Sequence, residues 1–255
     1  LYTAGVGLGD SIQLISLILS IKKHIKLSQI FYLGEHENHF KGKLREYNIE
    51  VNTIDLDIRY FGFRWWHFFI AKKKFLSQNL DKFDLIVDLQ SKIRNTCILK
   101  RLPHVEFYSA TFRFKFCTRK IQSESKDHLE NLNYFLDSNI KNIKFDMDNL
   151  PKTLKDEAIR LLPDKNYIGF SITQGNVYRK KSWSVIKFIQ LANKINENNK
   201  TPVFLIGKEQ AELIKEIKSK VPNALFPEFY SNISCPALVT ALASRLSLAI
   251  SIDNG

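Results

Sequence analysis

The chain opens with LYTAGVGLGDSIQLISLILSIKKHI (residues 1–25), in which a short apolar run, a glycine-rich turn and an apolar helical pattern follow one another. A strand, a tight turn and a helix in this order predict the first unit of a parallel α/β sheet. Turns of this kind usually bind phosphate, because unpaired N–H groups and the positive end of the helix dipole converge there. Asp10 places a negative charge at that point, so the turn needs a different explanation.

The same alternation of strand and helix patterns continues along the chain. Further strands are predicted at IFYL (30–33), VNTI (51–54), FDLIVDL (83–89) and VEFYSA (105–110), with a helix near residues 37–47. A polar stretch, residues 139–163, includes one linking helix, and a second alternation runs from YIGFSI (167–172) to LSLAISIDNG (246–255). This pattern predicts an α/β fold of two Rossmann-like domains with mostly parallel sheets, residues 1–150 and 151–255, and a ligand cleft between them.

Composition narrows the class of partner. The chain has 255 residues, a hydrophobic fraction of 44% and a formal net charge of +12. Such a charge indicates a polyanionic partner: nucleic acid, an anionic membrane surface or a phosphorylated substrate. The longest apolar stretch, FFIA, is far shorter than the ~20 residues of a membrane span. Three cysteines without a C-x-x-C pair argue against a disulfide framework or a structural zinc site and favour a reducing compartment.

Asp10 has two interpretations. It can be the N-cap of the following helix, which is worth ~1 kcal/mol. It can also be a general base at a strand end that takes a proton from a substrate hydroxyl. In the second case the surrounding loop residues, Gly7, Gly9 and Ser11, would line the acceptor, and the glycines would allow it to come close.

A basic loop follows a strand in the second half, at SITQGNVYRKKSW (171–183). Hydroxyls, amides and cations precede a helix N-terminus there, a combination that suits a diphosphate or is simply solvated surface. The candidate anion-binding residues are Ser171, Thr173, Gln174, Gly175, Arg179, Lys180 and Lys181.

Five motifs in order resemble glycosyltransferase family 9, the lipopolysaccharide heptosyltransferases. They are GLGDSI (7–12), FDLIVDLQSKIRN (83–95), KSW (181–183), FLIGKE (204–209) and ISIDNG (250–255). The stretch HLENLNYFL (128–136) is also similar to the helix that precedes the linker in that family. The resemblance implies a GT-B fold whose N-terminal domain binds the acceptor and whose C-terminal domain binds a nucleotide sugar, typically ADP-heptose. It also implies metal-independent, inverting transfer without a cofactor, and a C-terminal domain that is incomplete at Gly255.

The resemblance assigns roles to individual residues. Asp10 matches the base that activates the acceptor hydroxyl, and Lys181 matches the lysine that contacts the donor phosphates. Thr173 lies in the adjoining donor loop, and Glu209 or Glu212 matches the acid that binds the ribose. The family's D-x-G at the donor phosphates corresponds to Asp253, Asn254 and Gly255, with Asn254 in place of the common threonine.

Other segments leave alternatives open. The stretch RYFGFRWWHFFIAKKK (59–74) fits an interfacial helix on anionic lipid, or a helix whose Trp65, Trp66, Phe68 and Phe69 pack into the core. The motifs DLD (55–57) and DMD (146–148) imitate the metal-binding D-x-D of a different glycosyltransferase fold.

The function expected from the sequence is heptose transfer to a lipopolysaccharide core acceptor in the cytoplasm, with a peripheral contact at the inner face of the inner membrane. Two alternatives remain: a transferase of the same fold for another surface glycan, and a non-catalytic basic module that binds nucleic acid. The sequence contains no RNP, KH or zinc-finger pattern that would favour the second alternative.

Overall fold

The computed structural model divides the chain into two compact units, residues 1–45 with 49–145 and residues 46–48 with 146–255. Each unit is described by itself. For residues 2, 3, 10 and 34 the description concerns the backbone alone. The structure describes residues 2–3, 8–25, 29–34, 39–58, 61–90, 92–123, 125–164, 166–173 and 183–252.

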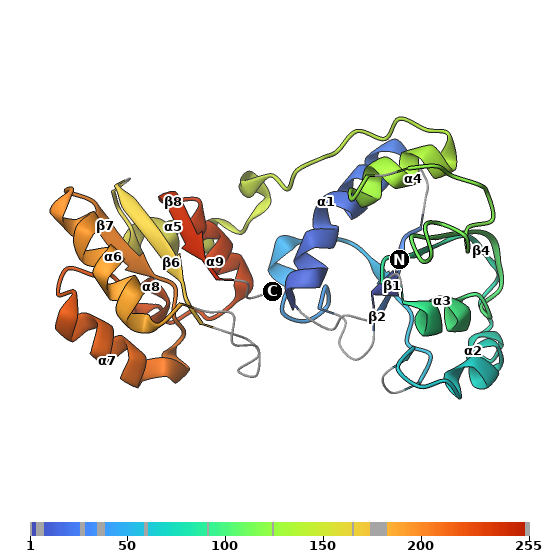
Figure 1. The fold of residues 1–255 in the computed structure, drawn as a ribbon, viewed down its shortest axis with the longest axis horizontal. Coiled ribbons are helices and arrows are strands. Elements are labelled where there is room, and N and C mark those ends of the chain that lie inside the picture. Colours follow the sequence, from blue (N-terminus) through green and yellow to red (C-terminus); the bar gives the residue numbers. More distant parts are fainter. Residues whose placement is uncertain are drawn as a thin grey trace. The chain divides into compact units, whose positions relative to one another are not determined.

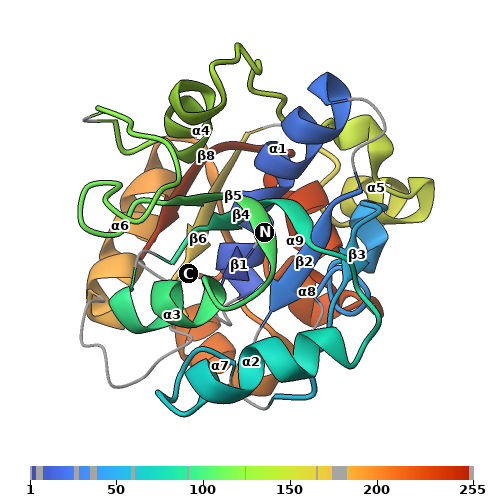
Figure 2. The same cartoon turned by 90° about the vertical axis from the view of Figure 1, so that its right-hand side faces the viewer.

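Unit 1 is a five-stranded parallel sheet with helices on both sides. Its elements are β1 (Tyr2–Thr3), α1 (Leu8–His24), β2 (Phe31–Gly34), β3 (Asn52–Thr53), α2 (His67–Leu76), β4 (Phe83–Asp88), α3 (Ile93–Leu99), β5 (His104–Ser109) and α4 (His128–Leu136). Figures 1 and 2 show α1 and α4 on one side of the sheet and α2 and α3 on the other. Buried residues of α2, α3 and the strands form one core cluster, which includes Phe75, Ile98 and Phe107.

The strand order of unit 1 is β3-β2-β1-β4-β5. The chain therefore builds outward from β1 in one direction and then, from β4, in the other. In open parallel sheets this reversal is the topological switch point, and ligands bind there at the carboxyl ends of the strands. In unit 1 it lies between β1 and β4, whose register pairs Tyr2 with Asp88.

Unit 2 contains a three-stranded parallel sheet in the order β7-β6-β8. Phe170, Phe204, Phe188 and Ile217 share one core cluster, which places α6 and α7 together against the sheet. Figure 1 shows α5 and α9 on the other side. The elements are α5 (Lys152–Leu161), β6 (Tyr167–Ser171), α6 (Val185–Glu197), β7 (Thr201–Phe204), α7 (Ala211–Lys220), α8 (Pro227–Tyr230), α9 (Pro236–Ala243) and β8 (Leu246–Ser251).

The prediction of a helix near residues 37–47 is wrong for residues 39–47, which the structure describes. Residues 39–44 form turns, and a single 3-10 turn follows at Arg45–Tyr47. The backbone N–H groups of Gly42 and Leu44 both donate to His39 O, and Asn48 adopts a left-handed conformation with φ 52°. These turn bonds replace the i to i−4 ladder that a helix needs.

Local sequence explains where other helices begin and end. The Asp127 carboxylate caps α4 by accepting from the N–H groups of Leu129 (2.7 Å) and Glu130 (3.0 Å), as N-cap aspartates do. Helix α1 ends on Lys22, Lys23 and His24, which favour the negative end of the helix dipole. Among the described helices, none is both long enough and apolar enough to cross a membrane.

Candidate functional site

A cavity of about 330 Å³ opens in unit 1 at the switch point of the sheet. Its wall comes from α1, from the turn after β4 and from the start of α4. The apolar part is made by leucines and the polar part by amides, a hydroxyl, an imidazole and two charged groups. The lining residues are Gln13, Leu14, Ser16, Leu17, Leu89, Gln90, Lys126, Asp127, His128, Leu129 and Asn142.

Position 10 belongs to the first turn of α1. The helix begins at Leu8, so Asp10 is its third residue and the N-cap interpretation is wrong. An acid in a first helical turn still stabilises the helix through the dipole, by about 0.3–1 kcal/mol. Gln13 and Leu14, which line the cavity, follow position 10 by one turn of the helix. The backbone thus places residue 10 one turn from the cavity wall.

The two residues on either side of Asp10 differ in their exposure to solvent. Gly9 lies inside α1 and is partly exposed. Ser11 is fully buried, and its hydroxyl lies 3.1 Å from the Tyr32 hydroxyl of β2. This placement favours a structural role for Ser11, which ties α1 to the sheet.

Sequence reasoning assigned no role to the cavity residues, and His128 is one of them. Its Nδ1 is buried and has no hydrogen-bond partner among the described residues. Burial lowers the pKa of the imidazole, against the opposing effects of Asp127 and Asp88. A neutral imidazole in the cavity wall can form a hydrogen bond with a ligand hydroxyl through a ring nitrogen that the ligand reaches. Only its place at the start of α4, after a predictable cap, could have suggested it.

A buried polar network supports the floor of the switch point. The Asp88 carboxylate accepts from the hydroxyls of Thr96 (2.6 Å) and Ser109 (2.8 Å). It also accepts from the Gln90 N–H at 3.0 Å, which fixes the turn that lines the cavity. Asp88 is fully buried, so these bonds compensate for the loss of water around its charge.

A further bond joins two parts of the cavity wall. The Ile143 N–H donates to Ser20 Oγ of α1 at 2.8 Å, next to the cavity residue Asn142. Helix α1 is thus joined to the segment that follows α4, and the cavity wall is built from fixed elements.

In unit 2 the described donor candidates lie at the carboxyl ends of adjacent strands. Ser171 ends β6 and Thr173 follows it, both partly exposed. Gly207 and Glu209 follow β7, which pairs in parallel with β6. Parallel strands present their carboxyl ends at one edge, so this edge collects the candidates. Gln174, Lys181, Asp253, Asn254 and Gly255, like Gly7 of unit 1, lie outside the described residues.

The structure distinguishes Glu209 from Glu212. The Glu209 carboxylate lies where a Cβ on Gly207 would stand, and it lines a small pocket of about 60 Å³ with Glu228, Ser234 and Cys235. The Glu212 side chain is 87% exposed and bonds Lys215 at 2.8 Å. Glu209 therefore lies in a pocket after β7, whereas Glu212 points to solvent and pairs with Lys215.

Glu228 is a second acid in this pocket. Burial raises the pKa of its carboxyl group, and the nearby Glu209 charge adds to the effect. Two carboxyl groups in one pocket can accept hydrogen bonds from a ligand with adjacent hydroxyls, such as a ribose. The sequence offered no signal for Glu228, which comes from α8.

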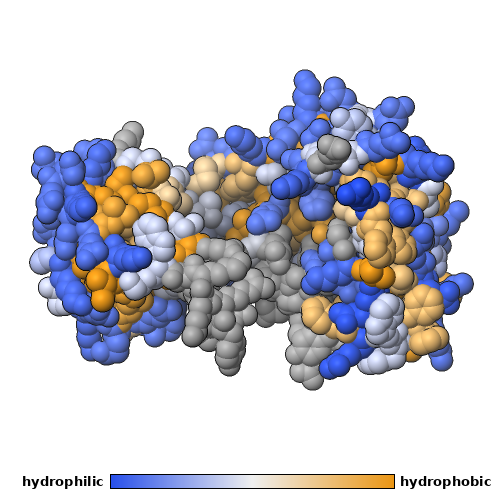
Figure 3. Space-filling model, viewed as in Figure 1, coloured by the Kyte–Doolittle hydropathy of each residue, from blue (hydrophilic) through white to orange (hydrophobic). Residues whose placement is uncertain are grey.

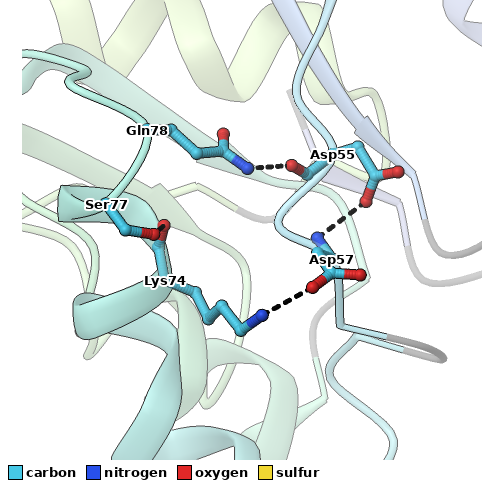
Figure 4. Close-up of polar contacts among 5 residues, drawn as sticks. All are labelled: Asp55, Asp57, Lys74, Ser77 and Gln78. Carbon is cyan, nitrogen blue, oxygen red and sulfur yellow. Dashed lines mark hydrogen bonds and ion pairs between the residues drawn. The ribbon is translucent and has the colours of Figure 1, made fainter.

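The two D-x-D motifs make structural contacts. Figure 4 shows the Asp57 carboxylate bound to Lys74 of α2 and the Asp55 carboxylate bound to the Asp57 N–H, at 2.6 and 2.8 Å. In the second motif, Asp146 accepts from the Asp148 N–H at 2.9 Å. Across the described part of the chain, no three His, Cys, Asp or Glu side chains group as metal ligands do.

Comparison with known proteins gives a fold. No protein-family model matches the sequence, and no curated protein matches it. The glycosyl transferase of family 9 from Veillonella parvula superposes with a TM-score of 0.64 at 15% identity, over 98% of this chain and 74% of that one. The E. coli heptosyltransferase WaaC with ADP superposes with a TM-score of 0.64 at 14% identity, over 99% of this chain and 80% of that one. The UDP-GlcNAc 2-epimerase from Methanocaldococcus jannaschii superposes with a TM-score of 0.51 at 13% identity, over 94% of this chain and 75% of that one.

Two parallel α/β sheets, one in each unit, agree with these neighbours. One fold serves several activities, and the epimerase is an example among the three. The chain has a GT-B-type fold, and the resemblance to glycosyltransferase family 9 indicated by its sequence motifs is confirmed at the level of the fold.

Proposed function

We propose that the protein is a glycosyltransferase that moves a heptose or a related sugar from a nucleoside diphosphate to a lipopolysaccharide core acceptor. The observation that carries the proposal is the cavity at the switch point of unit 1, one helical turn from Asp10. Support comes from the fold shared with a heptosyltransferase whose structure holds ADP.

Unit 1 is the acceptor domain in this proposal. The cavity has the volume of a small-ligand site. Its apolar and polar walls suit a sugar ring, because the leucines contact C–H groups while Gln13, Gln90 and His128 bond hydroxyls. Asp10 takes the proton of the attacking hydroxyl, and general-base catalysis of this kind typically contributes ~100- to 10,000-fold.

Unit 2 is the nucleotide-sugar domain. Glu209 binds the ribose hydroxyls, while Lys181 and the loop around Thr173 bind the diphosphate. As the acceptor oxygen bonds to the anomeric carbon, the bond between that carbon and the phosphate oxygen breaks. The electron pair leaves with the nucleoside diphosphate, where Lys181 stabilises the growing negative charge. Transfer inverts the anomeric carbon and needs no metal in this proposal.

The test is a transfer assay combined with a binding assay. ADP, UDP and GDP are titrated calorimetrically, and transfer is measured from the corresponding nucleotide sugars to a heptose-deficient lipopolysaccharide core. Asp10→Asn is expected to lower transfer by at least ~100-fold while ADP binding stays unchanged. Asp84→Asn, which alters an exposed carboxylate of β4, is the matched control.

Glu209→Gln and Glu212→Gln test the donor half. Only the first is expected to weaken ADP binding, because Glu212 is exposed and bonded to Lys215. The proposal fails if no nucleotide sugar supports transfer. A transfer from a different donor, with the same dependence on Asp10, would instead identify a transferase for another surface glycan.

A further inference from the structure

Helix α2 has two apolar sides, and the fold buries one of them. His67, Ala71 and Phe75 are buried, and Phe68 and Ile70 pack against the core. Trp65, Trp66, Phe69 and Leu76 are exposed by 58, 55, 77 and 52%. The core-packing alternative is therefore wrong for both tryptophans and for Phe69, and correct for Phe68.

The exposed residues form one stripe. Positions 66, 69, 73 and 76 are separated by three, four and three residues, the spacing of one helix face. We call Trp65, Trp66, Phe69, Lys72, Lys73 and Leu76 the α2 face. Figure 3 shows hydrophobic and hydrophilic side chains next to one another over the α2 and α3 region. A solvent-facing helix side normally carries polar residues, so three exposed aromatic rings here point to a contact.

The charged side chains of the two stretches that form and neighbour this face are all basic. Residues 58–80 and 92–105 contain no aspartate or glutamate, and they include Arg64, Lys72 and Lys73. Asp57 neutralises Lys74 (Figure 4). Among the described residues, neither Lys72 nor Lys73 forms an ion pair with a carboxylate. Helix α3 packs on α2. Arg94 of α3 and Arg101, which follows the end of α3, have guanidinium groups 5.6 and 4.8 Å from the ring centres of Phe63 and Phe68.

The turn that carries the tryptophans is fixed. The Gly62 N–H donates to His67 Nδ1 at 3.0 Å, and Arg94 Nε donates to Gly62 O at 2.8 Å. Burial, followed by the charges of Arg64 and Arg94, lowers the pKa of His67, so its ring stays neutral and can accept. The backbone that carries Trp65 and Trp66 is thereby fixed, which reduces the backbone entropy lost when they bind a surface.

We propose that the α2 face docks on the surface of an anionic lipid bilayer. Trp65, Trp66 and Phe69 enter the interfacial region, where aromatic rings are favoured. Lys72 and Lys73 lie at the lipid phosphates. The charge selects this partner, because rings flanked by Lys72 and Lys73 are complementary to an anionic surface, and these cations repel a second copy of the same face. The proposal goes beyond the proposed function, since it concerns a surface and requires no transfer activity.

The test is sedimentation of the full chain with phosphatidylcholine vesicles, with and without phosphatidylglycerol. We expect binding to the phosphatidylglycerol vesicles at low salt and release near 1 M salt, where the screening length falls to about 3 Å. Lys72→Gln/Lys73→Gln is expected to weaken binding about 25-fold, because each basic residue near an anionic surface contributes about 1 kcal/mol. Phe69→Ser should weaken binding at least tenfold, since burying a phenylalanine side chain is worth ~1.5–3 kcal/mol.

Matched controls change the same chemistry elsewhere. Tyr134→Ser removes an aromatic ring that is 57% exposed on α4, and Lys194→Gln/Lys200→Gln removes two exposed charges from unit 2. Both controls should bind vesicles like the unaltered chain. Because Phe69 is 77% exposed, its variant is expected to fold normally, as the thermal midpoint will check. In a Trp183→Phe background, brominated phosphatidylglycerol should quench the fluorescence of the two remaining tryptophans.

Several results would overturn the proposal. Anionic vesicles that leave the protein in the supernatant at low salt would do so, as would a Phe69→Ser variant that binds as well as its Tyr134→Ser control. Binding to poly(U) but not to vesicles would assign the face to nucleic acid. A concentration-dependent dimer that Phe69→Ser dissolves, without vesicle binding, would assign it to a second copy. None of these readouts involves sugar transfer, so this proposal and the proposed function can fail separately.

Discussion

Asp88 offers a quantitative test of how unit 1 supports its cavity. It is fully buried at the end of β4, where it accepts from two hydroxyls and from the Gln90 N–H. The Thr111 hydroxyl lies 2.7 Å from Thr96 Oγ1. The hydroxyl hydrogens can therefore run from Thr111 to Thr96 and from Thr96 to Asp88. The perturbation is Asp88→Ala, which removes the common acceptor.

Three bonds to a carboxylate are worth roughly 5–9 kcal/mol in total, at about 1.5–3 kcal/mol each. Alanine recovers the cost of burying the charge, and the Thr96 and Ser109 hydroxyls can pair again with Thr111. We therefore expect the free energy of unfolding to fall by about 3 kcal/mol, near the lower end for a broken buried charge network. Asp88→Asn keeps the shape and one acceptor oxygen, and should cost about 1–2 kcal/mol.

The assay is urea unfolding, with hydrogen exchange of β4 and β5 to follow unit 1 separately. The expected loss corresponds to a thermal midpoint lower by roughly 6–12 °C. Asp84→Ala, on the exposed side of the same strand, should change stability by less than about 0.5 kcal/mol. If Asp88→Ala were as mild as Asp84→Ala, the network would not support the site and the reasoning would be refuted.

Two further predictions concern stability. The Arg160 guanidinium, together with the Ser231 hydroxyl, lowers the pKa of Glu157 to about 2. A depressed acid pKa stabilises the fold above the unfolded value near 4.3, and this contribution disappears as pH falls through 2. Glu157→Gln should therefore lower the free energy of unfolding by about 1 kcal/mol at pH 7, since solvent screens the pair, and should not change it near pH 1.5. An equal loss at both pH values in urea titrations would contradict this. Gly62 has a φ of 89°. Gly62→Ala should therefore lower the free energy of unfolding by about 1–2 kcal/mol, and Gly62→Asn should lower it less. Unchanged thermal midpoints would show that the turn before α2 is not constrained.

The elements that could be predicted are those with a strong local pattern. The apolar run FDLIVDL forms β4, and the stretch after Ser184 forms α6. Residues 39–47 were mispredicted because Gly42 and Asn48 adopt turns that compete with an otherwise helical composition. The start of α1 at Leu8 moved Asp10 from the cap into the first turn, since helix ends depend on loop geometry that periodicity does not encode.

In the candidate site, too, only the residues with a local sequence signal could be predicted. Asp10 and Glu209 follow strands and Ser171 ends one, so the rule that α/β sites lie at carboxyl ends could locate them. His128, Gln13 and Gln90 come from three separate segments and meet only because β1 and β4 are neighbours in the sheet. That strand order is a long-range property, and no local spacing in the sequence predicts it.

The central claim is that the cavity of unit 1 holds the acceptor. Ser16→Phe places a ring in the cavity wall, while Ser219→Phe adds one on the exposed side of α7 as a control. In steady-state transfer assays, we predict that Ser16→Phe raises the KM for the acceptor at least tenfold and leaves the KM for the nucleotide sugar unchanged. Ser219→Phe should change neither KM. An acceptor KM that does not change in a folded Ser16→Phe protein would contradict the account.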